Sequence, residues 1–452
     1  MNLFAVVGKP VLHSLSPRMH NAALAALKLR ARYVRLAADD ARAAFKAAEH
    51  LGLRGFNVTS PFKEDVARLV PYADSSVEYL QAANTVIHNG RGWEAFNTDP
   101  LGVVGALADA GCRLEGHAVV LGAGGAGRAA AHALDTWGVK VTLANRTLKR
   151  AQQAARRLGC PAVALGSKEL KAALAQARII VNTTSTDARV VDAQDLPRGA
   201  FVLEARYASR SQLAKDARAR GCLVIDGSAW LLHQGEESFR FFTGREAPKG
   251  RMDKALAAPP EERGEHLALV GFMGVGKSTL GRLVAEQLKM RCLDTDQLVG
   301  ERAKMAVAQL LVKKGEKALR RQEAGVVEEL PKKPVILSCG GGLVTVPATC
   351  AALRRRTRLV VWLWASPETS LARIGDPSSR PLLGKRPLAM ARSLLDARLE
   401  HYAEACDVVV DTEGRSAEAV ADQIVGLWRE LEAAPARGRR VGPSGRKSER
   451  EP

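Results

Sequence analysis

Gly271-Phe272-Met273-Gly274-Val275-Gly276-Lys277-Ser278-Thr279 matches the phosphate-loop pattern G-x-x-x-x-G-K-[ST]. The apolar run 267–270 precedes this stretch, and the helix-like segment 280–286 follows it. A strand, loop and helix in this order let backbone N–H groups and the helix N-terminus face a polyphosphate. The alternative, a glycine-rich turn that binds nothing, does not explain this context. The sequence therefore predicts an ATP site formed by Gly274, Val275, Gly276, Lys277, Ser278 and Thr279, with Lys277 on the outer phosphates and Ser278 as a ligand of Mg²⁺.

The length of the chain predicts more than one domain. At 452 residues it exceeds what a single hydrophobic core usually supports. Because the first strand of a nucleotide-binding sheet normally opens its domain, the residues before about 260 should form something else.

The formal charge of +19 suggests anionic ligands. Part of the excess lies in residues 435–452, which are rich in Arg, Gly, Pro and Ser and are predicted to be a disordered basic tail. Nucleic-acid binding is one interpretation of this charge, but aromatic residues are sparse and no nucleic-acid-binding motif is present. Basic pockets for small anions are the favoured interpretation.

Cysteine usage and hydropathy predict the compartment. The seven cysteines are scattered and never spaced as C-x-x-C, which predicts a reduced, zinc-free, cytoplasmic protein. The N-terminus does not resemble a secretion signal, and no apolar run approaches the roughly 20 residues that span a bilayer.

Three polar loops lie beside predicted strands and helices in the first hundred residues. They cover residues 8–17, 55–63 and 96–99, and they are rich in hydroxyl, amide and turn-forming side chains. Each has an ordinary explanation as turn or cap chemistry. Together they predict one site for a ligand with several hydroxyl groups.

These loops resemble the substrate-binding signatures of shikimate dehydrogenases, in segments 8–21, 57–63, 83–85 and 97–99. The resemblance implies that Ser14 and Ser16 bind the substrate carboxylate and that Thr59, Asn84 and Asp99 bind its hydroxyls. It further implies that Lys63 and Asp99 are the catalytic pair. An ammonium beside a carboxylate can stabilise the oxyanion formed by ketone reduction and supply its proton.

A dinucleotide-binding fingerprint follows the apolar strand 118–121. Residues 122–127 satisfy G-x-G-x-x-G, and the next strand ends in Asn145-Arg146-Thr147 instead of the acidic residue typical of NAD sites. Because an arginine can pair with a 2′-phosphate, the sequence favours NADPH. The predicted NADP contacts, including a phosphate clamp similar to that of the family, are Gly122, Ala123, Gly124, Gly125, Ala126, Asn145, Arg146, Thr147, Arg150 and Gly227.

The end of this half departs from the family pattern. Tyr207 and Gln234 resemble its last substrate contacts. Glu204 stands where the family usually has Asp, and residues 209–212 replace a turn that contains Pro and Thr. Pro100 replaces a glycine and Phe242 a tryptophan. These departures bear on cofactor affinity and rate, because Lys63 and Asp99 are intact.

Residues 266–434 resemble shikimate kinase over nearly their whole length. After the phosphate loop come Asp294 and Asp296, predicted at alternate positions of a strand end so that both face the metal and phosphates. The resemblance implies that Asp296 orients or deprotonates the attacking hydroxyl and that Asp294 supports Mg²⁺ through its waters. It also implies that Arg320 and Arg398 bind the substrate carboxylate, that Gly340, Gly341 and Gly342 approach its ring, and that Arg380 on a mobile lid neutralises the transferred phosphoryl group. Leu311 and Leu319 stand where this family more often has Phe.

The sequence thus predicts an α/β protein with a two-lobed dehydrogenase, including a Rossmann lobe, followed by a P-loop kinase with a parallel five-stranded sheet. The predicted domains are a substrate-binding and catalytic lobe (1–100), a Rossmann NADP lobe whose last helix returns to the first lobe (101–245), a linker (246–265), the kinase (266–434) and the tail (435–452).

The predicted function is NADPH-dependent reduction of 3-dehydroshikimate to shikimate, then ATP- and Mg²⁺-dependent phosphorylation to shikimate 3-phosphate, by a monomer or homodimer that contacts no membrane. One alternative keeps the kinase beside a quinate-specific or degenerate reductase half. Another is a nucleotide-dependent module that binds nucleic acid.

Overall fold

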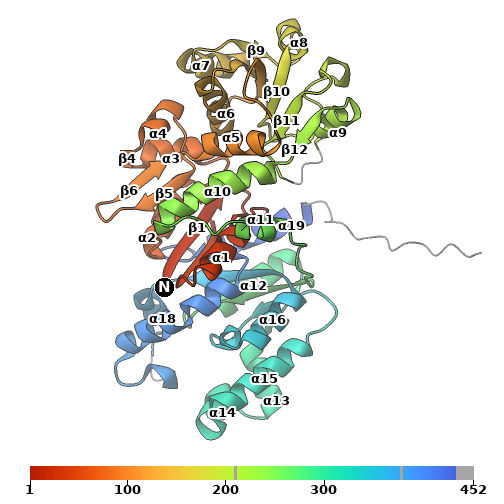
Figure 1. Ribbon diagram of the computed structural model, residues 1–452. Coiled ribbons are helices and arrows are strands. Elements are labelled where there is room, and N and C mark those ends of the chain that lie inside the picture. Colours follow the sequence, from red (N-terminus) through yellow and green to blue (C-terminus); the bar gives the residue numbers. More distant parts are fainter. Residues whose placement is uncertain (208–210, 377–379, 434–452) are drawn as a thin grey trace, which may run out of the picture.

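The computed structural model describes residues 1–207, 211–376 and 380–433. Three lobes lie in a row, with the N-terminal lobe between the Rossmann lobe and the kinase (Figure 1). The basic tail and residues 209 and 210, one of the predicted departures, lie outside the described residues.

The N-terminal lobe is a twisted sheet covered by helices. Its buried strands are apolar, as in Leu3-Phe4-Ala5-Val6-Val7 of β1. Its strands are β1 (Asn2–Gly8), β2 (Ala31–Ala37), β3 (Gly55–Val58), β4 (Tyr72–Ala73), β5 (Thr85–His88) and β6 (Trp93–Phe96). Its helices are α1 (Ser16–Ala26), α2 (Ala41–His50), α3 (Lys63–Leu69) and α4 (Ser75–Leu80).

The second lobe has the Rossmann arrangement. Its six parallel strands lie in the order β12-β11-β10-β7-β8-β9. They are β7 (His117–Leu121), β8 (Lys140–Asn145), β9 (Ala162–Ala164), β10 (Ala177–Asn182), β11 (Phe201–Glu204) and β12 (Leu223–Ile225). The helices are α5 (Asp99–Asp109), α6 (Gly125–Thr136), α7 (Leu148–Leu158), α8 (Lys168–Ala175) and α9 (Gln212–Ala219).

Helix α10 (Gly227–Thr243) returns the chain to the first lobe, where it contacts α1 as well as α5. Asp226 caps its N-terminus by accepting a hydrogen bond from the Ser228 N–H, and Gly244 ends it with a φ of +67°. This helix therefore connects the two lobes of the dehydrogenase half.

The kinase strands are parallel, in the order β14-β15-β13-β16-β17. They are β13 (His266–Val270), β14 (Arg291–Asp294), β15 (Val335–Ser338), β16 (Thr357–Trp364) and β17 (Val408–Asp411). The helices are α12 (Lys277–Leu288), α13 (Thr295–Ala303), α14 (Val307–Lys314), α15 (Glu316–Glu328), α16 (Pro347–Arg356), α17 (Pro367–Ile374), α18 (Pro387–Ala405) and α19 (Ala417–Ala433).

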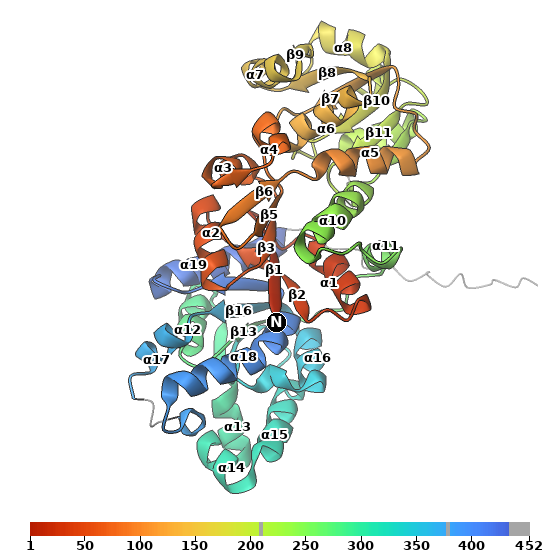
Figure 2. The same cartoon turned by 60° about the vertical axis from the view of Figure 1, so that its left-hand side comes forward.

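The kinase sheet does not end at β17. This strand pairs in parallel with β2, through the registers Val409 to Leu36 and Val410 to Ala37. The five kinase strands and the six strands of the first lobe therefore form one mixed, 11-stranded sheet, antiparallel where β5 meets β3 and β6. In Figure 2 the first lobe lies directly against the kinase. The five-stranded kinase sheet was predicted; its continuation was not.

The segment 246–265, expected to be a linker, is partly helical. Helix α11 (Arg251–Ala257) packs against α1, and Met252 is buried there. Arg18 of α1 donates hydrogen bonds to the carbonyl oxygens of Ala258 and Pro259, at 2.5 and 2.7 Å. This part of the chain is therefore attached to the first lobe.

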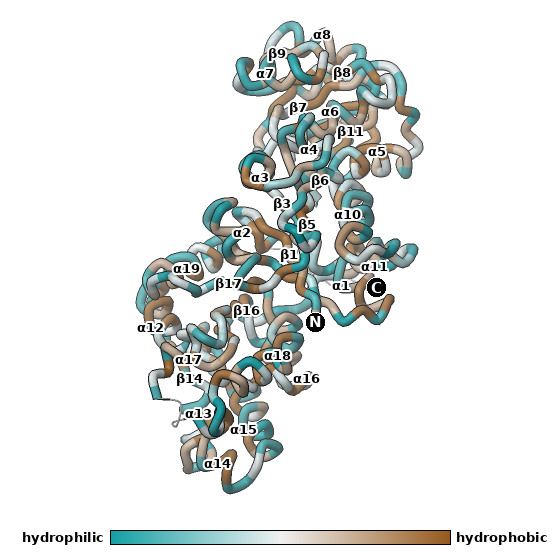
Figure 3. The backbone as a smooth tube through the Cα atoms, turned by 90° about the vertical axis from the view of Figure 1, so that its left-hand side faces the viewer, coloured by the Kyte–Doolittle hydropathy of each residue, from teal (hydrophilic) through white to brown (hydrophobic). Residues whose placement is uncertain are grey.

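Hydrophobic side chains form four buried clusters in the described residues, and the largest spans the first lobe and the kinase. In Figure 3, hydrophobic stretches run through the interior and many outer turns are hydrophilic. Among the described residues, no helix combines the length and apolar character needed to cross a membrane.

Candidate active sites

The predicted catalytic pair of the dehydrogenase half is in contact. Lys63 is the first residue of α3, Asp99 is the first residue of α5, and the Lys63 Nζ lies 2.5 Å from the Asp99 Oδ2. The side chains are 16% and 6% exposed, so the pair is largely shielded from solvent. Two helix N-termini distant in sequence thus place an ammonium and a carboxylate together.

The predicted substrate residues Ser14, Ser16, Thr59 and Asn84 lie on the first lobe, which also carries Lys63. Ser14 and Ser16 are buried, with their hydroxyl oxygens 3.2 Å apart. Thr59 joins this loop to the second one, because its N–H donates to the Val7 carbonyl and its side chain fills the space beside Gly8. Asn84 donates to the Gln234 Oε1 at 3.3 Å.

Tyr207 contacts the backbone of the first loop. Its hydroxyl lies 3.2 Å from the His13 carbonyl oxygen, to which it donates, and it accepts from the Leu15 N–H at 3.3 Å. The second lobe therefore reaches the predicted carboxylate-binding loop.

Sequence reasoning missed the residues that orient Asn84 and Gln234. Thr98 donates its N–H to the Asn84 Oδ1 at 2.8 Å and receives a hydrogen bond from the Asn84 amide at 3.0 Å. Ser238, one helical turn after Gln234, is fully buried and lies within 3.2 Å of the Thr98 hydroxyl. Thr98 lies inside a recognised motif and could have been chosen; Ser238 in the middle of α10 gave no signal.

The glycine-rich turn is shaped for close approach of a dinucleotide. Gly122 has a φ of +109°, and a Cβ on Gly127 would overlap the Gly122 carbonyl, so only glycine fits there. A Cβ on Gly125 would lie 3.4 Å from the Cβ of Lys63. The start of α6, with Gly124 at its N-cap and Ala123 and Ala126 beside it, therefore faces Lys63, the predicted catalytic lysine, and fits a pyrophosphate.

The predicted 2′-phosphate clamp lies at the end of β8. Arg146 and Thr147 are exposed there, and the Asn145 amide donates to the Thr147 carbonyl at 3.1 Å. Arg150 reaches the first lobe, where its guanidinium lies 2.9 Å from Glu64, a carboxylate that also pairs with Arg128 at 3.0 Å. Burial alone would raise the pKa of Glu64, but the two arginines lower it.

The departures from the family pattern are accommodated locally. Glu204 is 1% exposed and accepts from the Asn182 amide at 3.0 Å and from the Ser211 hydroxyl at 2.7 Å. Ser211 in turn caps α9, so two of the departures support each other. The backbone of Glu204 also approaches Gly227 closely.

The two remaining departures fit their surroundings as well. Pro100 occupies the first turn of α5, where proline is favoured. Phe242 stacks on Phe4 with ring centroids 5.0 Å apart.

The phosphate loop has the predicted structure between β13 and α12. Gly271, Gly274 and Gly276 all have positive φ angles. Lys277 donates to the carbonyl oxygens of Gly271 and Phe272 at 3.0 and 2.7 Å, and burial lowers the pKa of Lys277 to about 8. The loop curls around the ammonium that is expected to meet the phosphates.

The kinase carboxylates gather beside this loop, although the strand ends earlier than predicted. Strand β14 stops at Asp294, which caps α13, and Asp296 lies in the first helical turn. The expectation of alternate positions on one strand was therefore wrong, because an Asp favours the N-cap over a continued strand. The Asp294 Oδ1 accepts from the Asp296 N–H at 2.9 Å, which keeps both carboxylates together.

Ser278 links these carboxylates to the loop. Its hydroxyl lies 2.9 Å from the Asp294 Oδ2 and 3.1 Å from the hydroxyl of Ser338, a residue that sequence reasoning missed. Hydroxyl and carboxylate oxygens are the ligands that Mg²⁺ prefers, so Ser278 and Asp294 fit a magnesium site. Burial, and secondarily Asp294, raises the pKa of Asp296, while Lys277 opposes the shift.

The glycine triplet approaches the predicted substrate groups. A Cβ on Gly340 would overlap the Asp296 carboxylate, and one on Gly342 would overlap the Arg320 guanidinium. The Gly341 carbonyl accepts from the Arg398 Nη1 at 3.3 Å. The missing Cβ atoms of Gly340 and Gly342 therefore leave room for the Asp296 and Arg320 side chains to lie against this turn.

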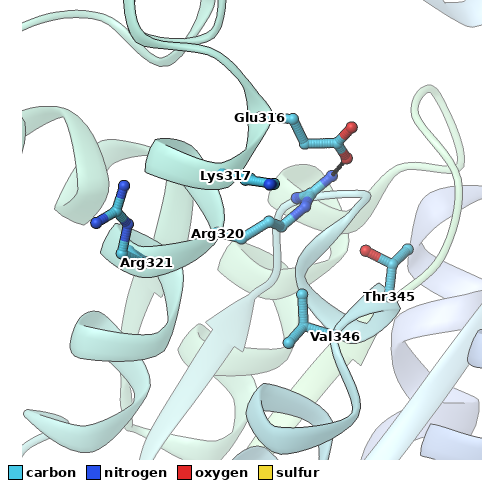
Figure 4. Close-up of a pocket in the computed structure, with 6 residues that line it drawn as sticks. All are labelled: Glu316, Lys317, Arg320, Arg321, Thr345 and Val346. Carbon is cyan, nitrogen blue, oxygen red and sulfur yellow. Dashed lines mark hydrogen bonds and ion pairs between the residues drawn. The ribbon is translucent and has the colours of Figure 1, made fainter.

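Arg320 is held by acidic neighbours. Its Nη1 donates to both oxygens of Glu323, at 2.7 and 2.9 Å, and its Nη2 donates to Glu316 at 2.7 Å. Figure 4 shows Arg320 and Lys317 projecting from α15 beside a cavity of about 520 Å³, with Thr345 and Val346 opposite. Glu316 and Glu323 thus orient the guanidinium predicted to bind a carboxylate.

Three further positions named in the sequence prediction, Arg380, Leu311 and Leu319, lie in the kinase half. Arg380 is exposed, and its positive charge acts on Lys277 and Asp296; residues 377–379 of the predicted lid lie outside the described residues. Leu319 is buried in a cluster with Val299 and Leu310, and Leu311 packs against the same cluster.

These two sites define a class of protein: a two-lobed Rossmann reductase joined to a P-loop kinase. Protein-family models match this chain in four segments. They are the shikimate dehydrogenase substrate binding domain (residues 6–86), the shikimate / quinate 5-dehydrogenase family (107–204), the shikimate 5′-dehydrogenase C-terminal domain (231–257) and shikimate kinase (273–428).

Individual relatives support the family matches of the dehydrogenase half. The shikimate dehydrogenase (NADP(+)) of Halobacterium salinarum is 43% identical over 267 residues, which are 57% of this chain and 99% of that protein. The crystal structure of the Thermus thermophilus enzyme, in complex with NADP(H) and shikimate, is 33% identical, with a TM-score of 0.51 over 56% of this chain and 98% of that one. Quinate dehydrogenase from Corynebacterium glutamicum, in complex with NAD, is 30% identical, also with a TM-score of 0.51, over 56% and 98% of the two chains. The chain belongs to the shikimate dehydrogenase family and carries a C-terminal shikimate kinase domain.

Proposed function

We propose that this chain catalyses two consecutive reactions of chorismate biosynthesis. The first is NADPH-dependent reduction of 3-dehydroshikimate to shikimate, and the second is ATP- and Mg²⁺-dependent phosphorylation of shikimate to shikimate 3-phosphate. The observation that carries this proposal is the Lys63–Asp99 contact of 2.5 Å, which faces the glycine turn of the Rossmann lobe. The kinase domain adds the step that consumes the product.

In the reductase half, NADPH supplies the hydride when bound. Lys63 holds the proton that the resulting oxyanion needs, and Asp99 keeps the ammonium oriented. The hydroxyls of Ser14 and Ser16 donate hydrogen bonds to the substrate carboxylate. Thr59, Asn84 and Gln234 face the ring hydroxyls of the substrate. Arg146, with no acidic residue at the end of β8, supports NADP over NAD.

In the kinase half, Arg320 and Arg398 bind the shikimate carboxylate against the glycine triplet. Asp296 then lies close enough to this turn to orient the attacking hydroxyl, and its raised pKa suits a group that accepts a proton. Lys277 and Arg380 balance the charge of the phosphates. Ser278 and Asp294 would hold Mg²⁺, which would neutralise further phosphate charge.

The test follows NADPH absorbance when the whole protein meets 3-dehydroshikimate, first alone and then with ATP and Mg²⁺. We expect oxidation that proceeds further when ATP is present, with shikimate 3-phosphate as the product. If adding shikimate and ATP releases ADP but NADPH is never oxidised, the kinase assignment would stand and the reductase assignment would be refuted.

A quinate-directed reductase is the second candidate, because the Corynebacterium quinate dehydrogenase is 30% identical to this chain. Steady-state rates with 3-dehydroshikimate and 3-dehydroquinate, each with NADPH and NADH, separate the two. A higher kcat/KM for 3-dehydroquinate would favour the second candidate. The oligomeric state and the cytoplasmic location stay predictions.

A further inference from the structure

The kinase domain contacts the predicted carboxylate-binding loop of the dehydrogenase. Glu430, near the end of α19, accepts a hydrogen bond from the Leu12 N–H at 2.8 Å. Burial raises the pKa of this carboxylate, while the N–H groups of Val11 and His13 also stabilise its charge. The Leu12 amide, two residues before Ser14, is therefore bound by a kinase side chain.

Arg35 makes a second connection. Its Nε and Nη2 donate to the Ser14 carbonyl oxygen at 3.1 and 2.7 Å, and its Nη1 donates to the Asp407 carbonyl oxygen at 3.0 Å. Asp407 directly precedes β17, and Arg263 pairs with its carboxylate at 2.6 Å. The Ser14 backbone is thus tied to a well-anchored point of the kinase.

Backbone pairing fixes the distance between these groups. Arg35 lies in β2, which is hydrogen-bonded to β17 through Leu36 and Ala37. Both views of the ribbon place α19 beside the first lobe (Figures 1 and 2). The connections therefore join parts of one sheet and the helix packed on it, which gives them a defined geometry.

We propose that Glu430 of the kinase domain is a positioning residue for the dehydrogenase substrate. It holds the backbone of residues 11–13, and this in turn aims the Ser14 and Ser16 hydroxyls at the substrate carboxylate. Hydrogen bonds to an ionised acceptor are stronger than neutral ones, so their loss loosens the loop appreciably. This inference rests on the proposed reductase activity.

The test uses the full chain with Glu430→Ala and Glu430→Gln. The matched control is Glu418→Ala, an exposed position in the first turn of the same helix. The measurements are kcat and KM for 3-dehydroshikimate, KM for NADPH, and the kinetics of shikimate phosphorylation.

We expect Glu430→Ala to raise KM for 3-dehydroshikimate about tenfold, and Glu430→Gln about threefold because the amide retains one acceptor oxygen. The kcat, the KM for NADPH and the kinase activity should stay within about twofold of the unmodified protein, as should all parameters of Glu418→Ala.

An unchanged KM for 3-dehydroshikimate in both Glu430 variants would overturn the proposal. So would a joint loss of both activities in both variants, because Glu430 would then support the fold as a whole. Absence of reduction in the unmodified protein would instead refute the proposed function, so the two failures are distinguishable.

Discussion

His20 is expected to limit the stability of this protein in acid. The imidazole stacks on Tyr33 with ring centroids 4.3 Å apart and lies near Phe239 and Phe242. It is 1% exposed, and neither ring nitrogen has a hydrogen-bond partner among the described residues. Burial lowers the pKa of His20 from 6.5 to about 3. The ring is therefore held neutral in an aromatic environment that cannot solvate its charged form.

The size of the effect follows from this pKa difference. Between pH 6.5 and about pH 3, the unfolded chain binds a proton at His20 that the native protein does not bind. Stability therefore falls as the pH falls through this window. At about 1.4 kcal/mol per pH unit, the loss reaches about 2 kcal/mol at pH 5 and about 4 kcal/mol near pH 3, where the native imidazole begins to bind the proton as well.

The test compares the unmodified protein with His20→Phe, which keeps an aromatic ring in the stack but cannot titrate. Urea unfolding at pH 7 and pH 5 should show the unmodified protein losing about 2 kcal/mol more than the variant. His88→Gln, a half-buried histidine in the same lobe, is the control and should behave like the unmodified protein. Equal losses for His20→Phe and the unmodified protein would refute the reasoning.

Three further predictions concern the active sites and the tail. Lys63→Ala should lower the reduction rate by roughly 10²-fold or more while sparing phosphorylation, and Lys277→Ala should do the reverse; loss of both activities in either folded variant would contradict two separate sites. Arg146→Ala should raise KM for NADPH about tenfold or more and leave KM for NADH nearly unchanged, and equal effects on both cofactors would argue against a 2′-phosphate contact. Deletion of the residues after Ala434 should leave both activities intact, whereas their loss together with salt-sensitive nucleic-acid binding would favour the nucleic-acid alternative.

Much of both candidate sites could be predicted because local sequence patterns carry it. The phosphate loop and the glycine turn need particular residues at fixed spacing, since only glycine readily adopts the positive φ at Gly122 or Gly276. Resemblance then selected Lys63 and Asp99, which the structure brings into contact. Ser238 could not be found this way, because a serine inside a helix has no local signature of a role in a polar network.

The linker shows a different limit of sequence reasoning. Helix α11 packs through Met252, its one buried side chain in the described structure, and a single apolar residue creates no periodicity to detect. The pairing of β17 with β2 could not be predicted from the sequence either. Both strands are apolar and predict burial, but hydropathy does not say which strand becomes the neighbour of which.

That pairing changes how the two enzymes are connected. An unpaired edge strand exposes a row of backbone N–H and C=O groups, and here β2 and β17 cover each other's edge. The ion pairs across the junction, such as Arg415 with Asp39, are partly solvent-exposed and contribute little each. The relative orientation is therefore set mainly by the shared sheet and by buried anchors such as Asp407, whose pKa Arg263 and Arg354 hold low against its burial. Because the first lobe carries the predicted substrate loop and also this edge, the proposed role of Glu430 would make the kinase part of the support of the dehydrogenase site.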